Sequence, residues 1–507
     1  MSLFAKKSIE QLMAESSETE KGLKRTLSGG SLIALGIGAI IGAGLFVRTA
    51  SAAAQNAGPS VTLGFIVAAI GCALAGLCYA ELSSSIPIAG SAYTYSYATM
   101  GELIAWIIGW DLILEYAVGA ATVGIAWSEY LNNLLINVFH TSALPYQWCH
   151  SPFEKLIDPA THEVLAHGMM NIPALGIVSL LTMLLIKGTQ ESAVVNGIIV
   201  IAKVSIVVLI IIFGWSFINP ANHVPYIPPA GTYVDHQGIS HNFGGIMGIL
   251  GAAGVVFFAF IGFDAVSTAA QEAKNPKRDM PIGILGSLAI CTVLYILFAH
   301  VLTGIASTED FRTTGKEASV SFAITKYMTG FGWLAKLVTV AILAGFSSVI
   351  LVMLLGQSRV FYSMSKDGLL PKAFSAIHPK YKTPYKASLF ILILVGLFAA
   401  FVPGDIVGDM TSIGTLFAFM LVCVAVIVLR KTNPELKREF KTPFVPVVPI
   451  LGVIVCGAMI FGLGWTNWLR LVVWLLLGFI IYFGYSRKHS KLQNGIDMKS
   501  KDPEKDL

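Results

Sequence analysis

Ionisable side chains interrupt several long apolar runs of this sequence. Lys203 lies near the middle of the run 191–217, and Glu115 lies near the middle of the run 102–138. If each run forms a helix that rises about 1.5 Å per residue, both side chains fall near the midplane of a hydrocarbon layer about 30 Å thick. A charge at that depth is costly, so both residues are candidates for handling an ion or a ligand.

Lys203 is a candidate for proton exchange. Burial disfavours the charged form of an amine, so a buried lysine can take up and release a proton during a working cycle. The alternative is that Lys203 pairs with a carboxylate or with main-chain carbonyls for a purely structural reason. We expect the proton-exchange role.

Glu115 is a candidate contact for a cationic ligand group, such as the guanidinium of arginine or the ammonium of lysine. Tyr116 and Gly119 would share or neighbour its face of the helix. The alternatives are a protonated carboxyl group or a bridge between helices. Asp111 lies one turn earlier and is expected to be structural, and Asp264 is expected to cap a helix.

The stretch GIGAIIGAGLF, residues 36–46, places four glycines inside an apolar run. Glycine costs about 1 kcal/mol relative to alanine in a helix interior. A dinucleotide-binding loop is excluded, because Ile41 stands where a third glycine is required and no βαβ pattern surrounds the stretch. Two interpretations stay open. Gly38 and Gly42 form a GxxxG pattern for close helix packing, or the helix is unwound so that main-chain groups face a cavity.

A second interrupted run favours the unwound interpretation. The residues FIGFD, 260–264, break the apolar run 244–272. The second break lies five apolar runs after the first, so the two halves of the chain would enter a membrane from opposite sides. This is a sequence pattern of transporter binding sites. The N–H groups at half-helix N-termini attract a carboxylate, and free carbonyls at half-helix C-termini attract an ammonium. This chemistry suits the zwitterion of an amino acid.

The elements that must position these residues are membrane helices. The chain has 507 residues, of which 55% are hydrophobic and only 12% are charged, with a mean hydropathy of +0.73. A soluble protein would carry about twice this charged fraction, and a membrane β-barrel would show shorter segments of alternating polarity. We therefore expect an all-α polytopic membrane protein with about twelve transmembrane helices. The expected segments are 30–57, 60–86, 102–138, 171–187, 191–217, 244–272, 281–306, 333–362, 385–403, 405–430, 445–466 and 468–485.

The distribution of Lys and Arg predicts the orientation. Most of the basic residues fall in alternate loops and in the two terminal segments, which places both termini in the cytoplasm. The loops 139–170, 218–243 and 307–332 then lie outside, and 307–332 could carry a short helix over the entrance. The polar start of the chain is not a cleaved signal peptide, and five of the six cysteines lie in apolar runs, which argues against a disulfide framework.

Four motifs resemble the signature of the amino acid–polyamine–cation (APC) transporter superfamily. They are GIGAIIGAGLF (36–46), YAELSSSIPIAGSAYTY (79–95), EAKNPKRDMP (272–281) and SRVFYSMSKDGLLP (358–371). The twelve segments and GWDLILEY most resemble the cationic amino acid transporter branch and its bacterial proton-coupled relatives. The resemblance implies an inverted five-plus-five fold with two extra helices. The corresponding division is 1–28 (cytoplasmic), 30–217 and 244–430 (the two repeats), 445–485 (the last two helices) and 487–507 (cytoplasmic tail).

The resemblance also implies roles for individual residues. The substrate carboxylate would meet Ala43 and Gly44, and the ammonium would meet main-chain carbonyls at Ile40, Phe258, Ala259 and Ile261. Many family members carry Ser or Thr at the position of Ala43. Phe258 matches an aromatic gate, and Lys203 matches a lysine that replaces a sodium ion in proton-coupled relatives. The implied substrate site comprises Ile40, Ile41, Gly42, Ala43, Gly44, Glu115, Tyr116, Gly119, Phe258, Ala259 and Ile261, with Ser347 and Ser348 as possible pocket residues that could equally bond to their own helix.

The expected function is secondary transport of amino acids by proton symport and alternating access, with arginine, lysine or a small neutral amino acid such as alanine as substrate. An exchanger or a transporter-like nutrient sensor is the alternative. The sequence shows no metalloprotease, nucleophile or Walker A motif, so we expect no catalytic residue, metal or cofactor. The expected partners are the amino acid, protons and the lipid bilayer of the cell membrane, without nucleic acid or an obligatory protein partner.

Overall fold

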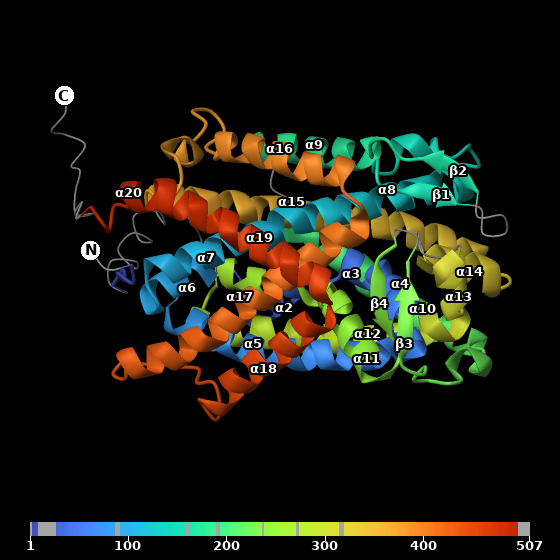
Figure 1. The fold of residues 1–507 in the computed structure, drawn as a ribbon, viewed down its shortest axis with the longest axis horizontal. Helices are drawn as coiled ribbons and strands as arrows, with labels where there is room; N and C mark the ends of the chain where they lie inside the picture. The colour runs from blue at the N-terminus through green and yellow to red at the C-terminus, as the bar shows by residue number, and fades with distance from the viewer. Residues whose placement is uncertain are drawn as a thin grey trace.

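The computed structural model describes residues 3–8, 27–86, 92–157, 163–188, 193–235, 238–269, 273–313 and 319–494. Lys21, Lys24 and Arg25, on which part of the predicted orientation depends, and the tail beyond residue 494 lie outside this description. The chain is predominantly helical, as expected (Figure 1).

The first predicted segment is a broken helix. It is divided into α2 (Gly29–Ile40), α3 (Ala43–Phe46), α4 (Arg48–Ala52) and a π-helical turn, η1 (Ala53–Ala57). Ser28 caps the start of α2, and the helix ends at Ile41, whose backbone is extended. The expected break therefore lies at residues 41 and 42.

The sixth predicted segment is also broken. The helix α11 (Gly245–Val256) tightens into the 3₁₀ turn η7 (Phe257–Phe260), and the chain resumes as η8 (Asp264–Ala269). Between them, Gly262 adopts a φ of 115°, which side chains rarely allow. Both interruptions predicted from glycine are confirmed.

Helices cover the remaining predicted segments. The third segment contains a π-helical stretch, η3, at Glu115, and such stretches often mark functional sites. The helices are α5 (Val61–Ser85), α7 (Glu102–Leu112), η3 (Ile113–Val118), α8 (Gly119–Asn137), α9 (Ile172–Ile186), α10 (Ala193–Gly214), α12 (Pro276–Ile305), α15 (Gly332–Lys366), α16 (Tyr385–Phe401), α17 (Gly404–Thr432), α18 (Val447–Gly462) and α19 (Trp465–Ile481).

Eight helical stretches in the described residues are long and apolar enough to cross a membrane, and four further apolar helices are shorter. The count of twelve crossings and the inverted repeat thus remain predictions. One boundary differs from expectation, because α12 begins at Pro276 rather than at Pro281. Pro276 lies in the first turn, where its missing N–H costs nothing, and Pro281 lies inside the helix.

Small residues allow the helices to pack closely. A Cβ on Gly36 would collide with Ser287, and a Cβ on Gly283 would lie 2.6 Å from Cβ of Leu32. The contact of α2 with α12 therefore depends on glycine from both sides, as is common between membrane helices.

The two ends of the bundle differ (Figure 1). Residues 3–8, α6 (Ala92–Thr99) and α20 (Arg487–His489) lie at one end, which we call the basic end. The opposite end, which we call the hairpin end, carries the hairpins β1 (Lys155–Ile157) with β2 (Val164–His167) and β3 (Gly231–Val234) with β4 (Ser240–Phe243).

The predicted helix in the loop 307–332 is present at the hairpin end as two short helices, α13 (Thr308–Thr313) and α14 (Ser319–Tyr327). Arg312 donates to the carbonyl of Ala54 at 2.9 Å, and Ser319 donates to the carbonyl of Phe46 at 2.9 Å. Burial alone would raise the pKa of Asp310, but hydrogen bonds from Lys326, Ser307 and Tyr327 lower it to about 2. The bonds of Arg312 and Ser319 hold the two helices against the second half of the broken first helix, and those of Asp310 join α13 to α14.

Candidate functional site

The broken end of α2 leaves main-chain carbonyls that other helices satisfy. The last four carbonyls of a helix have no partner within it. The carbonyl of Ile37 accepts from the N–H of Ile41, that of Gly38 accepts from Nζ of Lys203 at 2.9 Å, and that of Ile40 accepts from the hydroxyl of Tyr295 at 3.1 Å. Lys203 on α10 and Tyr295 on α12 therefore support the interruption.

The two broken helices touch through glycine. A Cβ on Gly44 would lie 2.5 Å from the backbone nitrogen of Ala259 and 2.8 Å from its Cβ. A Cβ on Gly262 would lie 2.9 Å from the carbonyl oxygen of Ala39. Each break thus requires glycine where it meets the other. For the predicted packing pair Gly38 and Gly42, the contact seen is at Gly42, where an added Cβ would lie 3.2 Å from Val349 of α15.

The N–H groups at the start of α3 are the donors predicted to meet a carboxylate. In the described residues, the N–H groups of Gly42, Ala43 and Gly44 have no hydrogen-bond acceptor, whereas those of Leu45 and Phe46 bond to the carbonyl of Gly42. The start of this half-helix therefore keeps several donors available for an anionic group.

The carbonyls predicted to meet the ammonium are partly engaged. The Tyr295 hydroxyl lies 3.0 Å from the carbonyl of Ala259 as well as near that of Ile40, and the carbonyl of Phe258 accepts from the N–H of Ile261 at 3.3 Å. Each carbonyl oxygen has two lone pairs, so these contacts leave room for one more donor. Tyr295 lies at this point between both breaks, and sequence reasoning missed it.

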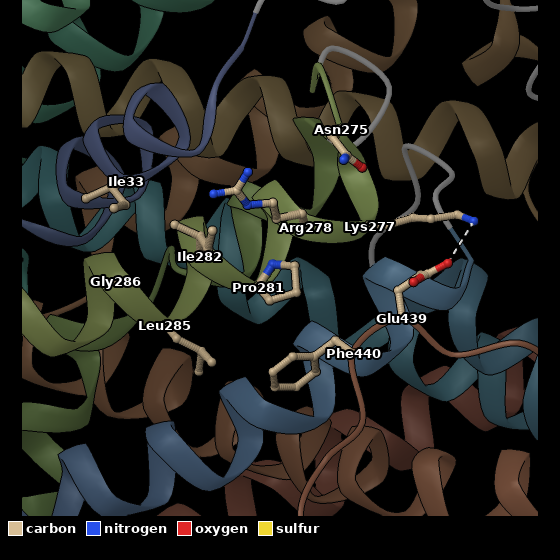
Figure 2. A pocket seen from close by; sticks show the side chains of 10 residues that line it. All are labelled: Ile33, Asn275, Lys277, Arg278, Pro281, Ile282, Leu285, Gly286, Glu439 and Phe440. Atoms are coloured by element: carbon tan, nitrogen blue, oxygen red, sulfur yellow. Dashed lines mark hydrogen bonds and ion pairs between the residues drawn. The ribbon is translucent and has the colours of Figure 1, made fainter.

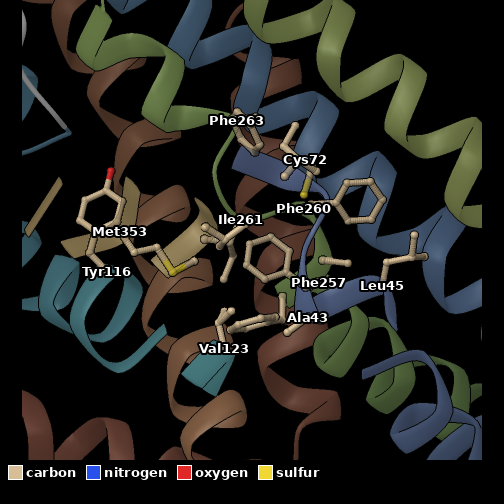
Figure 3. Close-up of a cluster of buried hydrophobic side chains, with 14 of the residues drawn as sticks. Ala43, Leu45, Cys72, Tyr116, Val123, Phe257, Phe260, Ile261, Phe263 and Met353 are labelled. Atoms are coloured by element: carbon tan, nitrogen blue, oxygen red, sulfur yellow. The ribbon is translucent and has the colours of Figure 1, made fainter. Parts of the chain in front are cut away.

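Apolar side chains surround the breaks (Figure 3). Phe257 and Ile261 from the second broken helix lie next to Ala43 from the first. Val123 on α8 and Met353 on α15 lie around Ile261, and a Cβ on Gly119 would lie 3.3 Å from the sulfur of Met353. This wall is suited to an aliphatic rather than a polar side chain.

The predicted gate and pocket residues are buried or turned to their own helix. Phe258 is buried, and its gating role stays a prediction. Ser347 bonds to the carbonyl of Leu343 one turn earlier at 2.9 Å, which is the structural alternative for this residue. Ser348 is buried.

The side chain of Lys203 passes Gly345 of α15 on its way to the first break. Its side chain is only 2% exposed. A Cβ on Gly345 would lie 2.7 Å from Cε of Lys203, so glycine at this position makes room for the lysine. The ammonium lies against the C-terminal end of α2, where the helix dipole favours positive charge.

Glu115 lies beside a second carboxyl group. Its side chain and that of Asp264 are buried and close enough to interact electrostatically. Tyr116 donates to Oδ2 of Asp264 at 2.7 Å. Both oxygens of Glu115, both oxygens of Asp111 and Oδ1 of Asp264 have no well-formed hydrogen bond in the part of the chain that the structure describes.

Asp264 is therefore more than a helix cap. It is the first residue of η8 and links the second break to η3 through Tyr116. Two buried carboxyl groups that interact in this way share a proton or require a cation, because like charges repel strongly in a low dielectric. The sequence could not show this pairing, since the two residues are far apart in the chain.

Ion pairs lie at both ends of the structure, and sequence reasoning missed them as well. At the basic end, Nζ of Lys7 lies 2.5 Å from Oδ1 of Asp367, and both side chains are buried. At the hairpin end, Arg48 pairs with Asp405 at 3.0 Å and with Asp409. The Lys7–Asp367 pair joins the segment before the first broken helix to the end of α15. The pairs of Arg48 join the second half of that broken helix to α17.

Comparison with known proteins agrees with this architecture. Residues 27–486 match the family described as amino acid permease. The chain is 44% identical to the branched-chain amino acid permease BcaP of Bacillus subtilis, over 97% of this chain and 99% of that protein. It is 41% identical to the methylthioribose transporter of Bacillus subtilis over the same shares.

The cationic amino acid transporters match at lower identity. The vacuolar cationic amino acid transporter 4 of Arabidopsis thaliana is 27% identical over 98% of this chain and 97% of its own length. The family resemblance seen in the four motifs is confirmed, and its members are permeases rather than enzymes. The chain belongs to the amino acid permease family of the APC superfamily.

Proposed function

We propose that this chain is a secondary transporter that imports amino acids by proton symport and alternating access. The observation that carries the proposal is the pair of facing breaks. Among the described residues, the N–H groups of Gly42, Ala43 and Gly44 have no acceptor at the first break, and the hydroxyl of Tyr295 lies at the carbonyls of both Ile40 and Ala259. Such a site holds the α-carboxylate by donors and the α-ammonium by acceptors, without a charged side chain.

The side chain of the substrate is aliphatic in this proposal. The apolar wall of Val123, Phe257, Ile261 and Met353 matches a branched hydrocarbon (Figure 3). The similarity to branched-chain amino acid permeases supports the same class. Buried apolar contact contributes roughly 25 cal/mol per Å², which is enough to rank leucine above alanine.

A cationic substrate is the second candidate. Glu115 and Asp264 form a buried acidic pair, and the described residues supply no cation to it. An arginine or lysine side chain would neutralise this pair. If the substrate is aliphatic, a proton shared by the two carboxyl groups reduces the charge of the pair instead.

In this proposal Lys203 links proton transfer to movement of the first broken helix. The protonated amine is held by the carbonyl of Gly38 at the end of α2. Loss of the proton weakens this charge–dipole contact and frees the end of α2 to move. Proton release and movement of the first broken helix are then parts of one step.

Alternating access follows from the two ion-pair clusters. Lys7 with Asp367 closes the basic end, and Arg48 with Asp405 closes the hairpin end. In this proposal both ends are closed in the described conformation, and each cluster separates in turn to admit or release substrate. We also propose that the basic end, with both termini, faces the cytoplasm of the cell, and that 30–217 and 244–430 are the two inverted repeats.

A competition experiment tests the substrate class. Purified protein in proteoliposomes takes up radiolabelled leucine under an inward proton gradient, with isoleucine, alanine, arginine and lysine as competitors. We expect isoleucine to compete best and Glu115→Gln to retain leucine uptake. Competition by arginine and lysine alone, together with loss of uptake in Glu115→Gln, would establish the cationic candidate. An absence of competition by every amino acid would refute the proposal, and binding of leucine without uptake would indicate a sensor.

A further inference from the structure

A groove of about 710 Å³ opens at the basic end, away from the two breaks (Figure 2). It lies between the start of α12, the helix α2 and the segment that follows α17. Its floor is apolar, with Ile33 from α2, Ile282 and Leu285 from α12, and Phe440 from the segment after α17. The carrier mechanism leaves this groove without a role.

The rim of the groove carries cations. Lys277 pairs with Glu439 at 3.4 Å, and Lys437 also lies 3.5 Å from Glu439. The positive charge of Lys437 and then of Lys277 lowers the pKa of Glu439, so this carboxylate is ionised and shared between two lysines. Lys277 is therefore partly neutralised.

Arg278 is the cation that remains available. Within the described residues its guanidinium makes no ion pair or side-chain hydrogen bond, and Figure 2 shows it extending above Ile282. The nearest acid in the chain, Asp279, accepts a hydrogen bond from the N–H of Asn275 at 3.1 Å. An arginine beside an apolar floor suits a ligand that carries both an anionic group and a hydrocarbon chain.

The apolar floor continues along the outside of α12. Ile282, Ile290, Val293 and Leu297 are 39%, 41%, 59% and 36% exposed. At about 100° per residue these four positions fall within one face of the helix. A hydrocarbon chain that starts in the groove can thus follow this face towards the middle of the membrane.

We propose that the groove binds an anionic phospholipid. The phosphate lies at Arg278, with Lys277 beside it, and an acyl chain covers Ile282, Leu285 and Phe440. A soluble phosphate would use the rim and leave the apolar floor exposed to water. Because Ile33 of α2 also lines the groove, the bound lipid contacts the half-helix that moves in the transport cycle.

Lipid titration tests this site. Purified full-length protein in detergent is titrated with dioleoylphosphatidylglycerol, and bound lipids are counted by native mass spectrometry. We expect one lipid of higher affinity, weakened about fivefold in Arg278→Gln, since one basic residue is worth roughly this factor towards an anionic lipid. Arg278→Lys should retain most of the affinity. Lys380→Gln, a change in another exposed basic loop, should leave it unchanged.

Four results would overturn the proposal. An equal loss of affinity for dioleoylphosphatidylglycerol in Lys380→Gln and Arg278→Gln would show that the lipid is attracted to basic loops in general. Equal binding of dioleoylphosphatidylcholine would remove the anion requirement. Displacement of the lipid by inorganic phosphate alone would show that the apolar floor takes no part, and formation of a dimer at the groove would assign it to a second copy of the chain.

Discussion

At the scale of single residues, Tyr295 supports both interruptions at once. Its hydroxyl lies within hydrogen-bond distance of the carbonyls of Ile40 and Ala259, and its ring packs against Phe65 and Phe260. Nothing in the sequence marks it, because a tyrosine in an apolar run is ordinary. Its role becomes visible only in the folded structure, where α12 brings its hydroxyl to the ends of α2 and η7.

Replacement of Tyr295 by Phe keeps the ring and removes the donor. We expect a loss of about 1–3 kcal/mol in unfolding free energy, because buried carbonyls lose a partner, together with weaker leucine binding. Tyr79→Phe is the matched control for stability, since the buried hydroxyl of Tyr79 has no hydrogen-bond partner in the described residues. Denaturant titration in detergent measures the unfolding free energy of the two variants. Equal stability of the two variants would contradict the bridging role.

At the scale of elements, glycine patterns predicted both broken helices correctly. The sequence could not show how the breaks meet, because the contact of Gly44 with Ala259 joins segments far apart in the chain. It also did not predict η3, since a π-helical stretch keeps the apolar pattern of an ordinary helix. The short helix α6 and the two hairpins were missed because their residues lack a long apolar period.

Gly44→Ala tests the contact between the breaks. The added Cβ would meet the backbone of Ala259, which cannot move aside as a flexible side chain does. We expect a destabilisation of about 1–3 kcal/mol and loss of leucine uptake, measured by thermal unfolding and proteoliposome assay. Gly176→Ala is the control, because nothing lies within 4 Å of a Cβ there. Uptake by Gly44→Ala at the rate of this control would show that the breaks need not touch.

At the scale of the whole molecule, distant segments close the basic end together. Besides the ion pair with Lys7, Asp367 accepts from the hydroxyl of Tyr93 at 2.6 Å, and its carbonyl accepts from the N–H of Lys491 at 3.1 Å. The N–H groups of Glu102 and Leu103 bond to the carbonyls of residues 5 and 3. Sequence reasoning assigned these termini only to a side of the membrane, because ion pairs between loops leave no local pattern.

Lys7→Gln should open the basic end. Removal of one partner from a buried ion pair costs several kcal/mol in the conformation that contains it, so the population shifts towards conformations in which the end is open. The readout is the rate at which a polar maleimide labels Ser267→Cys, a buried position in η8. The native cysteines of the described chain are buried, so background labelling is low.

Lys6→Gln provides the control for this shift, because Lys6 is exposed beside the buried Lys7. We expect faster labelling in Lys7→Gln than in the control, with the difference reduced by saturating leucine. Identical labelling rates in the two variants would contradict a closing role for the Lys7–Asp367 pair.

The most direct test of proton-coupled amino acid transport follows the proton itself. Proteoliposomes with a trapped pH-sensitive dye receive leucine outside, without an imposed gradient. We predict that leucine acidifies the interior with the wild-type chain and with the exposed-lysine control Lys336→Gln. Lys203→Gln should exchange leucine without acidification. Leucine uptake by the wild-type chain without acidification, or equal acidification in Lys203→Gln, would contradict the account.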